Sequence, residues 1–153
     1  MPFVGKFSTI DDPGMIAQDI QETLKIKESD FKEAQDQLRI FINKVENSGI
    51  LVFKSSVLFD NTHIKLDPNK FATLQEFRGF VIADKIAPAI LINAVDSMKA
   101  QIFTLFHELA HLWIGASGVS DVDYENTNEV ERLCNFVAVE ILMPEDRIRK
   151  KLG

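Results

Sequence analysis

Apolar residues in the first third of the chain recur at helical spacing. Asp12 and Pro13 form a typical helix start, in which an N-cap residue precedes a proline. The apolar residues that follow at helical spacing are Ile16, Ile20 and Leu24. A second stripe consists of Phe31, Ala34, Leu38, Phe41, Ile42 and Val45. The pattern therefore predicts two helices, one ending near Lys27 and one that opens at Ser29 and is closed by Gly49.

The pattern changes to strands after the second helix. Three stretches rich in β-branched, aliphatic and aromatic residues follow, at Ile50–Val57, Phe77–Ala83 and Ala89–Ala94. A polar region over residues 60–75 separates the first two of them. The connection 84–88 is short enough for a hairpin, which predicts that the second and third strands are antiparallel.

Two further helices are expected after the strands. Asp96 or Ser97 can cap a helix that runs to about Gly115. A polar, acidic loop over residues 117–127 follows, and Asn128 with an acid three residues later resembles a capping box that opens the last helix. Pro144 would stop that helix. The order of helices, strands and helices predicts an α+β domain with a small three-stranded antiparallel sheet.

The composition fits a single soluble domain of 153 residues. The chain is 46% hydrophobic and 26% charged, which excludes intrinsic disorder. Its net charge of −6 disfavours nucleic-acid binding as the main task. We divide it into a helical N-terminal segment, 1–48, that packs on or leads into the core, and a domain, 49–153, that contains the expected strands and the last two helices.

The expected location is the cytoplasm. The N-terminus lacks the apolar run of a secretory signal, and no stretch of 18 apolar residues could span a membrane. The lone Cys134 cannot form an intramolecular disulfide and lies in an apolar stretch. We expect it to be a buried thiol that packs like a small hydrophobic residue.

The expected helix 97–115 carries candidate metal ligands in the run His107-Glu108-Leu-Ala-His111. Residues four apart lie on one face of a helix, so the two imidazoles can bind one metal ion, by default zinc (Zn2+). Glu108 projects about 100° away from His107, which lets it flank the ion instead of ligating it. From there a carboxylate can take the proton of a water molecule whose pKa zinc lowers to about 7.

A catalytic zinc needs a third protein ligand and an open position for water. No histidine follows His111, so the third ligand is expected to be a carboxylate. The candidates are Asp121, Asp123, Glu125, Glu129, Glu131 and Glu140. Glu131 shares a helical face with apolar residues and is predicted to point inward, whereas Glu129 lies about 160° away, toward solvent. Glu131 is therefore the expected ligand, and its alternative role is that of a carboxylate favoured at a helix start.

Two stretches together resemble the ImmA/IrrE metallopeptidases. Residues 103–111 read Phe-Thr-Leu-Phe-His-Glu-Leu-Ala-His, and residues 131–144 begin with Glu-Arg-Leu-Cys-Asn and end with Met-Pro. Segments 49–53, 78–80 and 89–93 also follow the order of that family, so the resemblance covers about residues 49–144. It implies a zincin-like fold in which His107, His111 and Glu131 hold zinc and Glu108 is the general base.

The resemblance further implies a cytosolic protein of bacteria or of their mobile elements, such as phages. Many relatives cleave a partner repressor with a helix-turn-helix, which relieves transcription after DNA damage or element induction. We therefore expect a protein substrate, and no contact of this domain with nucleic acid or membrane. Some relatives carry their own helix-turn-helix, but residues 1–48 contain no basic recognition helix. Relatives usually continue past this chain's end, so we expect a short member or a part of a longer protein.

The expected reaction is zinc-dependent hydrolysis of a peptide bond. Zinc would polarise the scissile carbonyl and bind water, and Glu108 would deprotonate that water and pass the proton to the leaving amine. The substrate would lie extended along an edge strand of the sheet. Tyr124 and His63, both in expected loops, are further candidates for stabilising the developing oxyanion.

Two other functions remain open at this point. A catalytically silent regulatory or docking module would bind the metal without turnover, and its biological effect would survive Glu108→Gln. A structural protein with an incidental histidine pair would bind no zinc, and a chelator would not change its stability.

Overall fold

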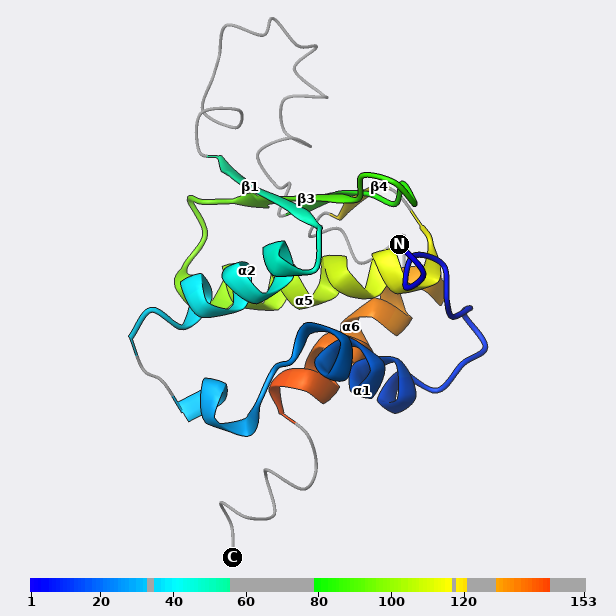
Figure 1. Ribbon diagram of the computed structural model, residues 1–153, viewed down its shortest axis with the longest axis horizontal. Helices are drawn as coiled ribbons and strands as arrows, with labels where there is room; N and C mark the ends of the chain where they lie inside the picture. Colours follow the sequence, from blue (N-terminus) through cyan, green and yellow to red (C-terminus); the bar gives the residue numbers. More distant parts are fainter. Residues whose placement is uncertain (33–34, 56–78, 117, 121–128, 144–153) are drawn as a thin grey trace, which may run out of the picture.

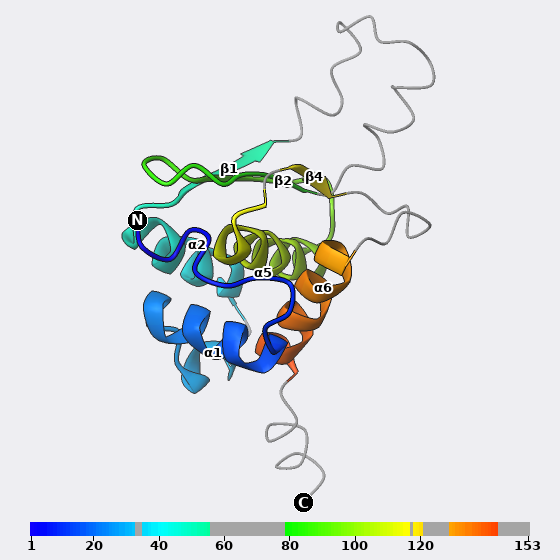
Figure 2. The same cartoon turned by 90° about the vertical axis from the view of Figure 1, so that its right-hand side faces the viewer.

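A computed structural model of the protein describes residues 1–32, 35–55, 79–116, 118–120 and 129–143. The predicted α+β class is confirmed. In chain order the elements are α1 (Pro13–Leu24), η1 (Glu28–Lys32), α2 (Gln37–Asn47), β1 (Leu51–Ser55), β2 (Gly79–Ile82), β3 (Ala89–Asn93), α5 (Met98–Ile114), β4 (Gly118–Ser120) and α6 (Glu129–Leu142). The sheet lies on one side of α2 and α5, and α1 and α6 lie on the other side of these helices (Figures 1 and 2).

Helix α1 begins as predicted, with Asp12 at the N-cap and Pro13 at its first position. It ends at Leu24, a little earlier than expected. Lys25 adopts a left-handed conformation with φ of 59°, and its N–H donates to the carbonyl of Glu22. A left-handed residue directly after the last turn is a common helix stop.

The single helix predicted between Ser29 and Gly49 is wrong. The chain forms a short 3-10 helix, η1, and α2 begins only at Gln37. Asp36, which precedes α2, has φ of 59° and ψ of 18°, a left-handed conformation that a continuous right-handed helix cannot contain. The apolar stripe crosses this break because Phe31 of η1 packs against Phe41 of α2, with ring centroids 5.3 Å apart.

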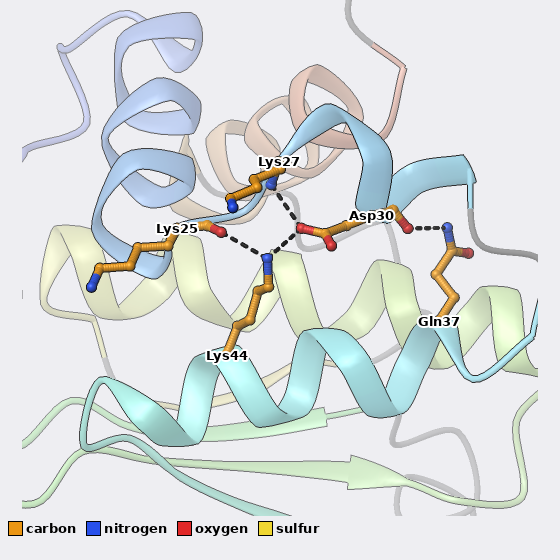
Figure 3. Close-up of polar contacts among 5 residues, drawn as sticks. All are labelled: Lys25, Lys27, Asp30, Gln37 and Lys44. Carbon is orange, nitrogen blue, oxygen red and sulfur yellow. Dashed lines mark hydrogen bonds and ion pairs between the residues drawn. The ribbon is translucent and has the colours of Figure 1, made fainter.

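A polar cluster around Asp30 joins α1, η1 and α2 (Figure 3). The Asp30 carboxylate accepts hydrogen bonds from the Lys44 ammonium group and from the backbone N–H of Lys27. Lys44 also donates to the carbonyl of Lys25 at 2.7 Å, and the Gln37 side chain donates to the carbonyl of Asp30 at 3.3 Å. The cluster thus fixes the turn that follows α1 against α2.

We expect the free energy of unfolding of the Asp30→Asn variant to depend less on pH in the acidic range than that of the wild type. Burial disfavours the carboxylate, but the hydrogen bonds from Lys44 and the Lys27 backbone outweigh it and lower the pKa of Asp30. This contribution is complete above the unfolded-state pKa of about 4 and is lost as the pH falls through the lower folded-state value. The variant should therefore lose about 1 kcal/mol at pH 7, measured by urea unfolding, and the difference should vanish toward pH 2.

The control for this prediction is Asp36→Asn. Asp36 forms an exposed ion pair with Arg39, and asparagine also tolerates the left-handed conformation. Its stability should change by less than about 0.5 kcal/mol across the same pH range. A loss in Asp30→Asn that stays constant down to pH 2 would contradict the prediction.

The sheet is mixed, with the order β1-β3-β2-β4 in the part of the chain that the structure describes. Strands β2 and β3 form the antiparallel pair predicted for them. Strand β1, however, pairs in parallel with β3, with Leu51 opposite Ala89, so the prediction of a three-stranded antiparallel sheet is wrong. A parallel pair needs a long connection, and residues 56–88 provide one between these strands.

The fourth strand, β4, lies in the stretch that was predicted as a polar loop. It pairs antiparallel with β2, and Phe80 lies opposite Val119. A strand of three residues is too short for the alternation of apolar and polar residues that marks a half-buried strand. Among the described strands, β1 and β4 lie at the two edges of the sheet.

Helix α5 lies at the centre of the molecule. Of the two predicted caps, Asp96 and Ser97, the helix uses Ser97, whose side chain accepts from the N–H of Ala100 at 3.2 Å. It ends as predicted at Gly115, with φ of 73°. The helix contacts the sheet through β2 and β3, and it contacts α1, α2 and α6 on its other sides. Most side chains from Gln101 to Trp113 are therefore buried, polar ones included.

The N-terminal residues pack against the end of α5 and pass between α5 and α1 (Figure 2). The N–H groups of Gly5 and Phe7 donate to the carbonyls of Leu112 and Trp113 in the last turn of the helix. Phe3 stacks on the Trp113 ring at 4.6 Å, and the Trp113 indole donates to Asp19 of α1 at 2.7 Å. Residues from both sides of position 48 therefore share one hydrophobic core.

No helix in the described residues has both the length and the hydropathy that a bilayer-spanning segment requires.

Candidate metal centre

His107 and His111 lie one turn apart on α5, with ring centroids 5.0 Å apart. Both residues are buried, with exposed fractions of 5% and 4%. The Nδ1 atom of His111 lies 3.0 Å from the carbonyl oxygen of Ala116, just beyond the end of the helix. A ring proton donated to this carbonyl fixes the orientation of the imidazole and leaves its Nε2 atom to serve as a ligand.

Glu131 approaches both histidines from the first turn of α6. Its Oε2 atom lies 2.9 Å from Nε2 of His107, and its Oε1 atom lies 2.7 Å from Nε2 of His111. The side chain is 26% exposed, so the carboxylate is more accessible to solvent than the two rings. One donor atom from each of the three residues lies within 4.8 Å of the other two.

The electrostatics of this cluster favour a positive charge between the three side chains. Burial disfavours an ionised carboxyl, but the hydrogen bonds with His107 and His111 outweigh it and lower the pKa of Glu131. Burial also disfavours a charged imidazole, but the contacts with Cys134 and Glu131 outweigh it and raise the pKa of His111. Burial raises the pKa of the Cys134 thiol, so the negative charge beside His111 comes from carboxylates. These are Glu131, which is hydrogen-bonded to the ring, and Glu108.

The three residues fit a divalent metal ion. Two imidazole nitrogens and one carboxylate form a common donor set for such an ion, and the backbone carbonyl of Ala116 fixes one of the rings. The positive charge that the cluster holds as a proton could equally be held as a cation bound to the same atoms. The structure thus brings together the three predicted ligands.

Glu108 lies beside this group and is fully buried between α5 and the sheet. Its Oε1 atom is 3.9 Å from Nε2 of His107, beyond hydrogen-bond distance but close to the donor atoms. A carboxylate adjacent to the donor group, rather than part of it, can accept a proton from a water molecule at the site.

The other predicted site residues do not join this group in the described part of the chain. Glu129 and Glu140 are exposed on α6. The remaining candidates lie outside the described residues: Asp121, Asp123, Glu125, Tyr124 and His63, together with the predicted helix-start Asn128 and helix-stop Pro144.

Sequence reasoning missed one contact of the site. Cys134 is buried as predicted, but it also contacts His111, one turn along α6 from Glu131. The spacing of three residues between Glu131 and Cys134 is the signal that places both on one helical face. Phe103 stacks on the ring of His107 with centroids 6.3 Å apart, as expected for residues four apart on α5.

Comparison with known families identifies the class of protein. Residues 45–153 match the model of a peptidase family described as the IrrE N-terminal-like domain. The chain belongs to this family. The IrrE N-terminal-like match begins near the end of α2 and includes both α5 and α6, so it contains all three residues of the candidate metal centre. The resemblance to ImmA/IrrE metallopeptidases is therefore confirmed. No curated protein and no solved structure shows a significant match.

Proposed function

We propose that this chain is a zinc-dependent endopeptidase with a zincin-like fold, in which His107, His111 and Glu131 hold the metal. The observation that carries the proposal is the convergence of three donor atoms, from two helices, within 4.8 Å of one another. Membership in a peptidase family supports a hydrolytic rather than a purely structural role for this group.

Each residue of the site has a distinct part in the proposed hydrolysis. A bound zinc ion supplies a Lewis acid that polarises a carbonyl group and makes water more acidic. Glu108 accepts the proton of the attacking water molecule and returns it to the leaving amine. The carbonyl of Ala116 holds the ring of His111, and Phe103 packs against the ring of His107.

The substrate is proposed to be a polypeptide that lies extended along β4, on the side away from β2. An extended peptide can add to a sheet edge through main-chain hydrogen bonds. Of the two edge strands described, β4 pairs with β2, which packs on α5 beside Glu108, whereas β1 is separated from β2 by β3. The resemblance to ImmA/IrrE peptidases supports a helix-turn-helix repressor as the substrate. It also supports a cytoplasmic location and a role in a stress or mobile-element response.

The test is a survey of new protein N-termini in an extract of the source cells treated with the zinc-loaded chain. We expect a small set of new termini that disappears when the chain is treated with a zinc chelator and returns when zinc is restored. A new terminus inside a helix-turn-helix repressor would support the finer proposal. New termini that form equally with chelator, or the absence of new termini with the zinc-loaded chain, would contradict the peptidase.

A further inference from the structure

We propose that Gly79 is a positioning residue for Glu108, because the missing side chain lets β2 lie directly on the carboxylate and hold it beside the metal centre. The inference deepens the proposed function and rests on it, since a positioned proton acceptor has a role only if the site performs hydrolysis. Gly79 is the first residue of β2, and nothing in the spacing of the metal ligands points to it.

The contact between β2 and α5 is closest at Gly79. A Cβ atom built at this position would lie 2.6 Å from Cγ2 of Thr104, 3.1 Å from Cγ of Glu108 and 3.2 Å from its Oε1 atom. Real Cβ atoms essentially never approach another heavy atom within 3.0 Å. Thr104 and Glu108 lie one turn apart on α5, so the strand at Gly79 covers one face of that turn.

Backbone conformation does not explain why position 79 is a glycine. Its φ angle lies outside the left-handed region, unlike that of Gly115, so alanine would not strain the main chain here. In strand β2 the buried residues Gly79 and Val81 alternate with the more exposed Phe80 and Ile82, as expected when one face of the strand packs on α5. Gly79 therefore lies on the helix-facing side, at a position where the space below is already filled by Thr104 and Glu108.

The contact between Gly79 and Glu108 involves the carboxylate oxygen that lies next to the candidate metal ligands. The oxygen that a Cβ at position 79 would approach, Oε1 of Glu108, is also the oxygen that lies 3.9 Å from Nε2 of His107. A Cβ at position 79 would lie 3.2 Å from this oxygen, a distance tighter than most real Cβ contacts, so the oxygen would have to move by a few tenths of an ångström or the strand would have to lift from the helix. Such a displacement matters for proton transfer, because a proton acceptor must remain within hydrogen-bond reach of its donor.

The experiment separates the position of Glu108 from the general packing of β2 on α5. The test variant is Gly79→Ala combined with Thr104→Ser, which removes Cγ2, the closest obstacle, and leaves the contacts with Glu108. Thr104→Ser alone is the first control. The second control is Val81→Ile, which adds a methylene at the neighbouring buried position of the same strand.

The probe is cobalt(II), substituted for zinc, whose visible absorption changes with pH as groups at the metal ionise. Glu108→Gln gives the reference profile of a site without the carboxylate. We expect the test variant to bind one cobalt ion and its midpoint pH to move at least halfway from the wild-type value toward that of Glu108→Gln. Both controls should keep the wild-type midpoint, although Val81→Ile should lower the melting temperature by about 2–8 °C through overpacking.

The outcomes distinguish the two proposals. A wild-type midpoint in the test variant, with a shifted midpoint in Glu108→Gln, would overturn the role of Gly79 and leave the proposed function intact. Identical midpoints in wild type and Glu108→Gln would overturn the role proposed for Glu108 and, with it, that of Gly79, while the metal ligands of the proposed function would stand. If the test variant does not fold, Glu108→Ala is added to it, because alanine lacks both contacting atoms. Recovery of folding would support the contact, and continued failure to fold would overturn it.

Discussion

Glu131→Ala is expected to lower the affinity for zinc by a factor on the order of 100 or more, since even residues that only support metal ligands contribute about 10–100-fold. The substitution removes a carboxylate whose two oxygens lie 2.9 Å and 2.7 Å from the Nε2 atoms of His107 and His111. Two histidines alone would leave the ion with fewer protein ligands than catalytic zinc sites use. Elemental mass spectrometry should find about one zinc ion per wild-type chain and almost none in the variant.

Glu129→Ala is the matched control for this prediction. Glu129 lies in the same first turn of α6 and carries the same charge, but its side chain is exposed and does not belong to the donor group. Equal zinc content in all three proteins would place the third ligand elsewhere and remove Glu131 from the site. Loss of zinc in both variants would instead indicate that the net charge of this turn, rather than a particular ligand, holds the ion.

Much of the central helix could be predicted because its determinants are local. Ser97 and Gly115 cap α5 through bonds and conformations that involve only neighbouring residues. The break before α2 was missed because Asp36 is not a residue type that marks a left-handed conformation as clearly as glycine does. The parallel pairing of β1 with β3 was missed because alternation identifies a strand but does not specify its partner.

The candidate site likewise combines residues that local spacing predicts with contacts that depend on how the elements pack. Helical periodicity alone places His107 and His111 on one face and turns Glu131 inward, and the structure brings these three side chains together. The carbonyl of Ala116 and the close approach of Gly79 to Glu108 arise from the packing of the chain around α5. Such contacts depend on distances between elements, and no spacing within a single element predicts them.

Glu108→Gln is expected to reduce peptide hydrolysis by roughly 100- to 10,000-fold while leaving zinc content unchanged. Glutamine has nearly the same shape as glutamate, so it can occupy the buried space beneath Gly79 without a cavity or a clash. It cannot accept the proton of the attacking water as a carboxylate does. The measurement is the rate at which purified substrate is cleaved by equal amounts of zinc-loaded protein.

Glu140→Gln is the matched control, because it makes the same substitution at an exposed position of α6 and should leave both rate and zinc content unchanged. The comparison also decides between an enzyme and a silent metal-binding module, since a module that acts by docking would retain its biological effect when only the proton acceptor is removed. If Glu108→Gln kept the wild-type rate, proton transfer would have to pass through another group. Loss of zinc together with activity would instead make Glu108 part of the metal-holding group, and its position 3.9 Å from Nε2 of His107 would then need a different explanation.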